Sequence, residues 1–292
     1  MSKELCVFGE VLFDVFPEGE QVLGGAPFNV AWHLQAFGQA PFFISRVGND
    51  AEGIEIRKTM LEWGMDTRQL QLDDDLPTGI VNITLNKGEP SYDIVEPSAY
   101  DNIDHINLSD ACSFLYHGSL ALRNQQSKQA LQQILGCSPE LVFVDVNLRA
   151  PWWEKESILA LIQQAHWVKL NTEELHLIYH SELKSPAALA NFIRDYGLQG
   201  VVLTHGAKGA EILTADNEHH FVEPVRGTEI VDTVGAGDAF CSVIIMGLKN
   251  DWPLPITMQR AQQFASAIVS LRGATVSDRS FYNDFLSDWG LA

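Results

Sequence analysis

The sequence predicts an α/β fold in which a mainly parallel sheet is covered by helices on both faces. Short apolar strands alternate with helical segments along most of the 292 residues, and polar residues recur where strands end. A helix between two strands favours parallel pairing, because it returns the chain to the same end of the sheet. With 46% hydrophobic residues and no repeat or low-complexity linker, residues 1–292 are expected to form a single domain.

The first half of the chain establishes this alternation. Strands are expected at 5–8 and 41–47, with helices at 30–37 and 51–63. Residues 78–85 and 91–95 instead alternate apolar and polar side chains, which predicts a β-hairpin. We expect β-hairpin lid elements at about 10–24 and 78–96, projecting from the body over a binding site. The alternative for the segment 78–96 is an added antiparallel edge of the main sheet.

The second half resumes the alternation of strands and helices. Strands are expected at 114–117, 141–145, 167–170 and 200–204, and helices from about 125, over 152–164, over 171–179 and over 257–271. A second hairpin is expected at 210–222. Trp152 and Trp153 are interpreted as core or interface residues. The polar residues at strand ends are Asp14, Asn147, Arg149, Asn171, Glu174, Thr204 and Gly206. Parallel strands end at one edge of a sheet, where ligands of open α/β folds bind.

Composition excludes several classes of function. Lys and Arg number 19 against 38 Asp and Glu, a formal net charge of −19, which disfavours binding to nucleic acid or to an anionic membrane surface. The four scattered cysteines have no C-x-x-C pair, so we expect free thiols in a reducing compartment and no zinc site. No signal peptide or membrane-spanning run is evident. These features predict a cytoplasmic protein.

The segment Asp232-Thr-Val-Gly-Ala-Gly-Asp-Ala-Phe240 carries the strongest chemical signal. Its two glycines allow the backbone N–H groups to converge, and the apolar run that follows predicts a helix beginning there. A helix N-terminus attracts anions such as phosphate. Asp238 lies in the first turn, where its carboxylate can accept a hydroxyl proton. Together these groups suit the phosphorylation of an alcohol; the alternative is an ordinary turn with an acidic helix cap.

Five motifs occur in one order along the chain: Gly24-Gly-Ala-Pro-Phe-Asn29, Asp145-x-Asn147-x-Arg149, Asn171-x-x-Glu174, Thr204-x-Gly206-x-x-Gly209 and Asp232–Phe240. With them the sequence resembles the ribokinase/PfkB family of carbohydrate kinases from about Leu5 to Phe285, and most closely its bacterial fructokinase-like members. One departure is Val146, where the family often has proline, so the loop before Arg149 lacks a fixed φ angle.

The resemblance implies a ribokinase-like fold with a small β lid, and ATP with Mg²⁺ as cofactors. It implies transfer of the γ-phosphoryl group to a sugar hydroxyl, with D-fructose to fructose 6-phosphate as the first candidate. Asp238 resembles the general base and is expected to have ordinary acidity. The amides of Gly235, Ala236 and Gly237 would hold the transferring group. Arg149 would reach the phosphates or the substrate, the alternative being a surface ion pair.

The remaining roles are also implied by the resemblance. The sugar would contact Asp14, Gly24, Gly25 and Asn29, and the nucleotide would contact Thr204, Gly206 and Gly209. Asn171 and Glu174 would face the hydration shell of Mg²⁺, the alternative being a helix cap and a first-turn acid. Backbone carbonyls around Asp232 and Val234 would hold a monovalent cation such as K⁺. Tyr92 and Asp93 of the hairpin are candidate substrate contacts, and the lid is a candidate surface for a homodimer.

Three alternatives to a fructokinase differ in what they require. A 2-keto-3-deoxygluconate kinase, or another sugar kinase of the family, would keep the same phosphoryl-transfer residues and change the hydroxyl partners. A catalytically silent protein that binds a sugar or nucleotide for regulation would be expected to lack the base or the glycine turn, and both are present. A dinucleotide-binding dehydrogenase needs a glycine-rich turn that opens the first helix, and Gly9-Glu10-Val11 does not begin one.

Overall fold

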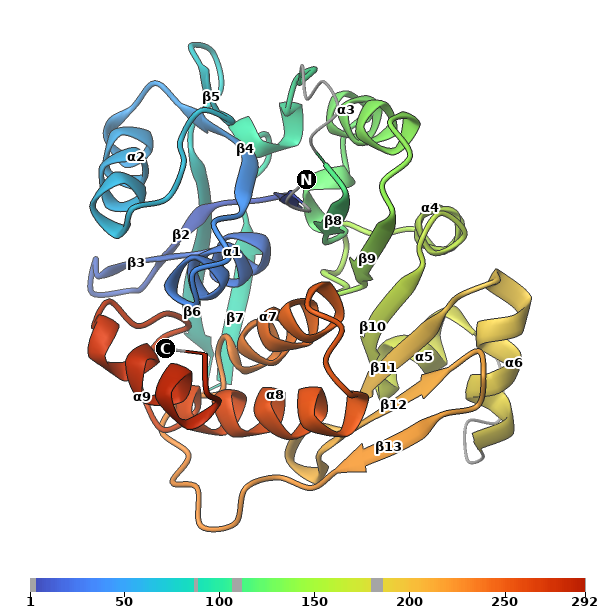
Figure 1. Ribbon diagram of the computed structural model, residues 1–292. Helices are drawn as coiled ribbons and strands as arrows, with labels where there is room; N and C mark the ends of the chain where they lie inside the picture. Colours follow the sequence, from blue (N-terminus) through green and yellow to red (C-terminus); the bar gives the residue numbers. More distant parts are fainter. Residues whose placement is uncertain (1–3, 87–88, 107–111, 180–185, 292) are drawn as a thin grey trace.

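A computed structural model describes residues 4–86, 89–106, 112–179 and 186–291 of the protein (Figure 1). Its centre is a nine-stranded sheet in the order β13-β12-β11-β10-β9-β8-β1-β4-β5. Pairing is parallel from β5 to β11, and β12 and β13 add two antiparallel strands. The predicted α/β class is confirmed. These strands are β1 Leu5–Phe8, β4 Phe42–Gly48, β5 Leu70–Asp73, β8 Phe114–His117, β9 Leu141–Asp145, β10 Trp167–Asn171, β11 Gly200–Thr204, β12 Ala210–Thr214 and β13 His219–Val222.

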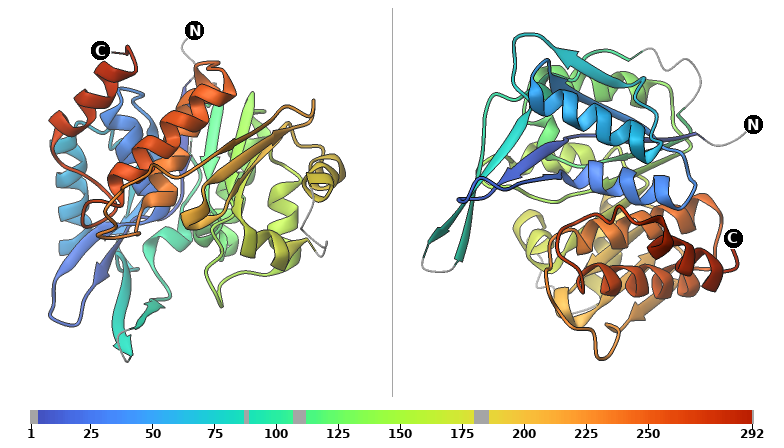
Figure 2. Two further views of the ribbon diagram at one scale, coloured as in Figure 1. Left: turned by 90° about the horizontal axis from the view of Figure 1, so that it is seen from below. Right: turned by 90° about the vertical axis from the view of Figure 1, so that its left-hand side faces the viewer.

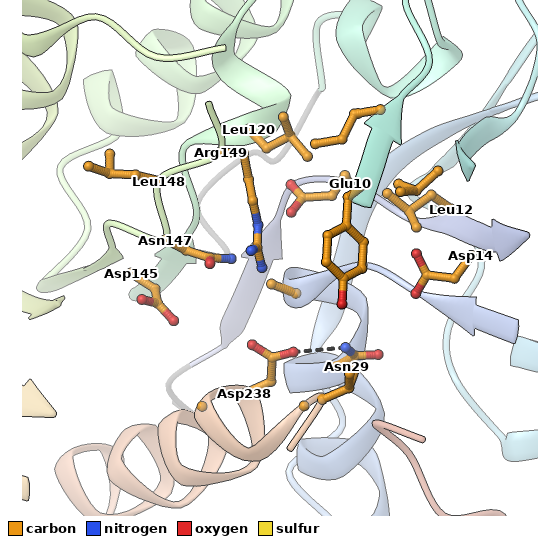
Figure 3. Close-up of a pocket in the computed structure, with 18 of the residues that line it drawn as sticks. Glu10, Leu12, Asp14, Asn29, Leu120, Asp145, Asn147, Leu148, Arg149 and Asp238 are labelled. Carbon is orange, nitrogen blue, oxygen red and sulfur yellow. Dashed lines mark hydrogen bonds between the residues drawn. The ribbon is translucent and has the colours of Figure 1, made fainter. Parts of the chain in front are cut away.

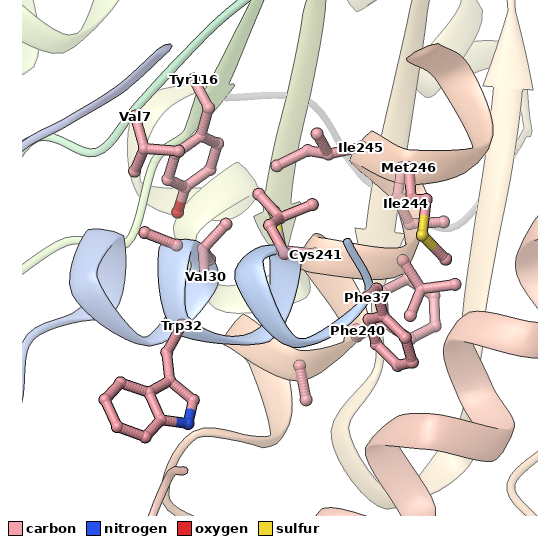
Figure 4. Close-up of a cluster of buried hydrophobic side chains, with 14 of the residues drawn as sticks. Val7, Val30, Trp32, Phe37, Tyr116, Phe240, Cys241, Ile244, Ile245 and Met246 are labelled. Carbon is pink, nitrogen blue, oxygen red and sulfur yellow. The ribbon is translucent and has the colours of Figure 1, made fainter. Parts of the chain in front are cut away.

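Helices pack on both faces of this sheet, because alternate strand residues point to opposite sides. Leu5 and Val7 belong to one buried core, and Cys6 and Phe8 belong to the other. The first core is covered by α1 Ala26–Ala36, α2 Ala51–Trp63, α7 Ala236–Lys249, α8 Leu254–Ile268 and α9 Arg279–Asp288. The second is covered by α3 Gln125–Gly136, α4 Lys155–Ile162, α5 Thr172–Ile178 and α6 Pro186–Tyr196. Figure 4 shows α1 and α7 meeting in the first core through Val30, Phe240 and Cys241.

A separate four-stranded sheet has the order β3-β2-β6-β7. Its strands are β2 Leu12–Val15, β3 Gln21–Gly24, β6 Gly79–Asn86 and β7 Glu89–Ile94. The two predicted hairpins pair with each other through β2 and β6, which run parallel, so segment 78–96 is not an edge of the large sheet. Residues 87–88 at its turn lie outside the described residues. Figure 2 shows β6 and β7 projecting from the body of the molecule.

Several elements differ from the prediction. Strand β5 and helices α6 and α9 were not predicted, although Phe281, Phe285 and Trp289 of the last segment are at helical spacing. Helix α4 begins at Lys155, not at 152, because the backbone of Glu154 is extended; Trp152 and Trp153 therefore lie in the preceding loop. Short 3-10 turns occur at Ala99–Asn102, Leu120–Leu122 and Gly206–Lys208.

The chain order places a ligand site at the middle of the large sheet. From β1 the chain adds β4 and β5 on one side and later β8 to β11 on the other. The connections after neighbouring strands therefore diverge at the carboxyl ends of β1 and β8, which is where a crevice forms in open α/β sheets. Within the described residues, none of the helices combines the length and the apolar character needed to cross a bilayer.

Candidate active site

A cavity of about 640 Å³ lies over the carboxyl ends of the central strands, and we call it the main cavity. The loop after β9, the end of β10 and the N-termini of α1 and α7 contribute to its wall, together with β2 and the hairpin β6–β7 (Figure 3). Six of the seven predicted strand-end residues line it: Asp14, Asn147, Arg149, Asn171, Glu174 and Thr204. The tertiary structure thus brings together residues that are up to 190 positions apart in the sequence.

The N-terminus of α7 forms the predicted amide turn. Gly235 is the N-cap with φ of 76°, a left-handed conformation that disfavours side chains. A Cβ atom at this position would lie 2.4 Å from the Cβ of Ala274, so glycine is also required by space. The amide of Ala236 donates a long hydrogen bond of 3.4 Å to the carbonyl oxygen of Thr233. The cap carries no side-chain hydrogen bond, so no side chain competes with an anionic ligand for the first amides of α7.

Asp238 follows these amides and lines the main cavity. Its Oδ2 accepts a hydrogen bond of 2.8 Å from Nδ2 of Asn29 (Figure 3). Burial raises the pKa of Asp238 to about 6, and this outweighs the lowering by Asn29, Lys169 and Arg149. The expectation of ordinary acidity is therefore wrong, because protein groups replace much of the water around the carboxylate. The group is still mostly ionised at neutral pH and is a stronger base than a solvated aspartate.

Asn29 is positioned by the unusual start of α1. Gly25 is the N-cap with φ of 110°, and a Cβ atom there would lie 2.7 Å from the carbonyl oxygen of Glu10. Asn29 is buried and lines the main cavity, and its Oδ1 has no hydrogen-bond partner among the described residues. Its Nδ2 orients Asp238, and the predicted contact between Asn29 and the sugar stays a prediction.

Three further charged groups line the opposite side of the main cavity. Arg149 lies in the loop after β9, and its guanidinium lowers the pKa of the surrounding carboxyls. Burial nevertheless raises the pKa of Asp14 to about 6 and that of Glu10 to about 7. Glu10 was not predicted as a site residue. A carboxylate directly after the first strand was the available signal, since strand ends form this edge of the sheet.

An ion pair between Lys169 and Asp145 was also missed. The two residues are register partners on β10 and β9, both are buried, and Nζ lies 2.7 Å from Oδ2. Burial lowers the pKa of Lys169, but Asp145 raises it further, so the ammonium stays charged. A Cβ atom on Gly237 would lie 3.7 Å from this Nζ, which places the cation beside the start of α7. A lysine inside the apolar strand Trp-Val-Lys-Leu was the sequence signal.

Asn171 and Glu174 form a capping box at the start of α5. Asn171 accepts from the amides of Glu173 and Glu174, and Glu174 accepts from those of Asn171 and Leu148, at 2.8–2.9 Å. Burial raises the pKa of Glu174, as does Asp145. These contacts are those of the helix-cap alternative, and both residues also line the main cavity. Among the described residues, no group of three or more His, Cys, Asp and Glu side chains is arranged to hold a metal ion.

A second cavity of about 400 Å³, the apolar cavity, adjoins the main one and shares Thr204, Thr233 and Gly237 with it. The predicted nucleotide residues Gly206 and Gly209 line it. Its apolar wall comes from α7 and α8, with Phe240, Ala265 and Val269. Two cavities that meet at the N-terminus of α7, one of them with an apolar wall, suit a ligand with an apolar ring and a polyanionic tail.

The other predicted residues lie at the margin. Gly24 does not line the main cavity; it neighbours Asp14, whose Oδ2 would lie 3.4 Å from an added Cβ. Asp232 accepts hydrogen bonds of 3.0 Å from the amides of Val234 and Gly273, so its carboxylate joins two loops. In the hairpin, Tyr92 lines the main cavity and its neighbour Asp93 does not.

Comparison with known proteins gives relatives along almost the whole chain. A fructokinase of Escherichia coli is 31% identical over 268 residues, covering 86% of each chain. An aminoimidazole riboside kinase of Salmonella typhimurium is 30% identical over 315 residues, covering 99% of this chain and 97% of the relative. The two relatives have different substrates by name, and the identities are nearly equal.

Solved structures have the same fold. A fructokinase from Xylella fastidiosa with bound ATP superimposes with a TM-score of 0.86 over 99% of this chain and 100% of its own, at 20% identity. A fructokinase double mutant from Vibrio cholerae O395, bound to fructose, ADP and potassium ion, gives a TM-score of 0.78 and 27% identity over 98% of each chain. Residues 3–280 match the description "pfkB family carbohydrate kinase". The chain therefore belongs to the pfkB family of carbohydrate kinases.

Proposed function

We propose that this protein is an ATP-dependent fructokinase, which transfers the γ-phosphoryl group to the 6-hydroxyl of D-fructose. The observation that carries the proposal is the position of Asp238, a cavity-facing carboxylate with a pKa raised to about 6, directly beside the uncapped amides of α7. A base and an anion-binding turn on one helix end are the two groups that phosphorylation of an alcohol requires.

The reaction follows from these groups. Asp238 accepts the proton of the sugar hydroxyl as the new O–P bond forms, and Asn29 holds its carboxylate in one orientation. The amides of Gly235, Ala236 and Gly237 donate to the oxygens of the transferring phosphoryl group, whose charge grows in the transition state. Lys169 lies behind the same turn, where Asp145 balances its charge, so the amides and the helix N-terminus supply the positive potential there. The chain has a net charge of −19, so this local positive potential is what makes an anionic substrate acceptable.

The nucleotide would occupy both cavities. The adenine ring suits the apolar cavity between α7 and α8, and the phosphates would cross Thr204 and Gly237 into the main cavity. Mg²⁺, when bound, supplies charge neutralisation at the phosphates. Glu174 and Asn171 fit contact through metal-bound water better than direct ligation, because their oxygens already accept backbone amides. Carbonyls of the loops that Asp232 joins would take a monovalent cation.

The sugar would lie at the side of the main cavity opposite the apolar cavity. Asp14 and Arg149 offer an acceptor and a donor for vicinal hydroxyls, and Glu10 adds a carboxyl that is half protonated near neutral pH. Ser91 and Tyr92 of the projecting sheet line the same space. We infer that this sheet acts as a lid over the sugar and excludes water during transfer.

A substrate screen tests the proposal. ATP consumption should be measured in a coupled assay with D-fructose, D-ribose, 2-keto-3-deoxygluconate, aminoimidazole riboside and nucleosides, and the position of the product phosphate should be assigned by ³¹P NMR. The highest kcat/KM is expected with D-fructose. A higher kcat/KM for aminoimidazole riboside, whose kinase is almost as similar to this chain, would support kinase activity but refute D-fructose as the substrate. No turnover with any acceptor would favour a silent binding protein.

A further inference from the structure

A third cavity, of about 510 Å³, lies between α3 and α4 and shares no lining residue with the main cavity. We call it the outer cavity; Arg123 and Ser119 are at its inner side, Gln132 and Lys128 are on α3, and Gln164 is beyond the end of α4. Trp152 and Trp153 also line it. The tandem tryptophans were interpreted as core or interface residues, but both remain half-buried at this opening.

The wall of the outer cavity is held in one arrangement by Arg123. The guanidinium pairs with Asp101 through two hydrogen bonds of 2.6 and 2.7 Å, and its side chain is 4% exposed. Its Cζ lies 4.7 Å from the ring centroid of Trp152. Cation–π contact of this kind fixes the indole in place. The cavity therefore has a preformed aromatic wall, as binding sites for small molecules usually do.

The chemistry of the wall indicates the class of ligand. Amide side chains of Gln125 and Gln132 can each donate and accept hydrogen bonds, and Gln164, whose Nε2 donates to the carbonyl oxygen of Ala160 at 3.0 Å, can still accept one. Outside the neutralised Arg123–Asp101 pair, the wall carries two carboxylates and one ammonium: Glu96, Glu154 and Lys128. This balance does not favour an anion. A neutral sugar satisfies both parts of the wall, because its C–H face packs on an indole while its hydroxyls reach the amides.

The outer cavity is connected to the main cavity by short covalent segments. Residues 94, 120 and 150 line the main cavity, and residues 96, 122 and 151 line the outer one. Arg123 also donates to the carbonyl oxygen of Val95 at the end of the lid hairpin, at 2.9 Å. Ser119 donates to the carbonyl oxygen of Val146, at 2.7 Å, in the loop that leads to Arg149. These shared segments are the route by which a ligand in the outer cavity would act on the main cavity.

We propose that the outer cavity is a second binding site for a neutral hexose, and that its occupancy is coupled to sugar binding in the main cavity. Hexose binding in the outer cavity depends on its indole and amide side chains, and not on which sugar is phosphorylated in the main cavity. Its ligand need not be a substrate, because the lining of the outer cavity lacks a glycine turn at a helix N-terminus like the one beside Asp238.

Equilibrium dialysis of the full-length protein with radiolabelled D-fructose and D-glucose tests the site. At least one hexose is expected to bind at a site that Gln132→Ala weakens about tenfold in affinity. This factor corresponds to the loss of one amide hydrogen bond together with the desolvation of its partner. Gln129→Ala is the matched control, since Gln129 is exposed on the same helix and does not line the cavity. Trp153→Leu gives a second variant, with thermal unfolding measured to confirm that each variant is folded.

Three outcomes would overturn the proposal. The first is hexose binding that is absent, or identical in wild type, Gln132→Ala and Trp153→Leu, since all binding would then be in the main cavity. The second is that glucose 6-phosphate displaces the labelled hexose more strongly than a neutral hexose does, at the site that Gln132→Ala weakens; the ligand would then be an anion and not a neutral sugar. The third is a KM for the substrate sugar that does not respond to the second hexose in wild type, which contradicts coupling. The first two readouts measure binding and are independent of whether the protein turns over fructose, and the third uses whichever sugar the protein phosphorylates.

Discussion

Replacement of Asp238 by asparagine separates catalysis from stability. Asparagine keeps the size of the side chain, and its Oδ1 can still accept from Nδ2 of Asn29, which now donates at 2.8 Å. The variant loses the general base, an effect that typically amounts to a factor of roughly 10² to 10⁴ in rate. We therefore expect kcat to fall by about this factor while the KM values for sugar and ATP change little.

The same change should stabilise the fold. The pKa of Asp238 rises from 3.8 to about 6 in the folded protein, so the ionised carboxylate opposes folding by at most about 3 kcal/mol. Water at the cavity mouth reduces this to roughly 1–2 kcal/mol. The pH dependence follows from the two pKa values. Below about pH 4 Asp238 is protonated in both the folded and the unfolded state, so it does not lower the free energy of unfolding; above about pH 6 it is ionised in both states, and the full destabilisation is present. Asp238→Asn should raise the free energy of unfolding at neutral pH and lose this advantage towards pH 4.

Two measurements decide the prediction. Turnover is followed by coupled ATP consumption at saturating sugar, and stability is followed by urea unfolding at pH 7.5 and pH 4.5. Asp216→Asn is the control, because Asp216 is exposed at the bend of the β12–β13 hairpin; it should alter neither quantity. An unchanged kcat in Asp238→Asn would refute the base assignment. A large loss of stability at neutral pH would refute the argument from burial.

Three further predictions concern the surrounding groups. Lys169→Met leaves the buried carboxylate of Asp145 without its partner and should lower the free energy of unfolding in urea by about 3–5 kcal/mol. The double variant Lys169→Met/Asp145→Leu should recover much of this loss. If the losses of the two single variants simply add in the double variant, the ion pair does not contribute as argued. Gly235→Ala should raise the KM for ATP at least about tenfold, because its Cβ would meet Ala274; Ala274→Gly should restore part of it, and a normal KM in the single variant would contradict the steric requirement. In the pH profile, kcat should fall as pH decreases through about 6, where Asp238 becomes protonated. Arg149→Met should shift this step to higher pH, because the guanidinium lowers the pKa of Asp238. A step at the same pH in the variant would mean that Arg149 is too far from Asp238 to act on it.

Much of the fold could be predicted because its signals are local. The alternation of apolar strands with helices indicated a parallel sheet, and alternation of period two between 78 and 95 indicated a hairpin rather than a helix. The glycine turn before Asp238 could also be predicted, because two glycines followed by an apolar helical run are a local signal. The positive φ of Gly235 and its close approach to Ala274 are seen only in the structure. Strand β5 was missed because its four residues, Leu-Gln-Leu-Asp, are not a continuous apolar run like those of β1 and β8, and its pairing with β4 exists only in the folded protein.

By itself, the sequence determined the class of fold, and it indicated the strand-end residues that line the main cavity and the candidate base with its amide turn. Only the tertiary structure decided which groups face one another: Asn29 binds Asp238 across 209 positions, Lys169 finds Asp145 on the neighbouring strand, and the two hairpins join in one projecting sheet. Side-chain type and spacing determine local conformation. Partners and pKa values depend on burial and through-space distance, which exist only once the chain has folded.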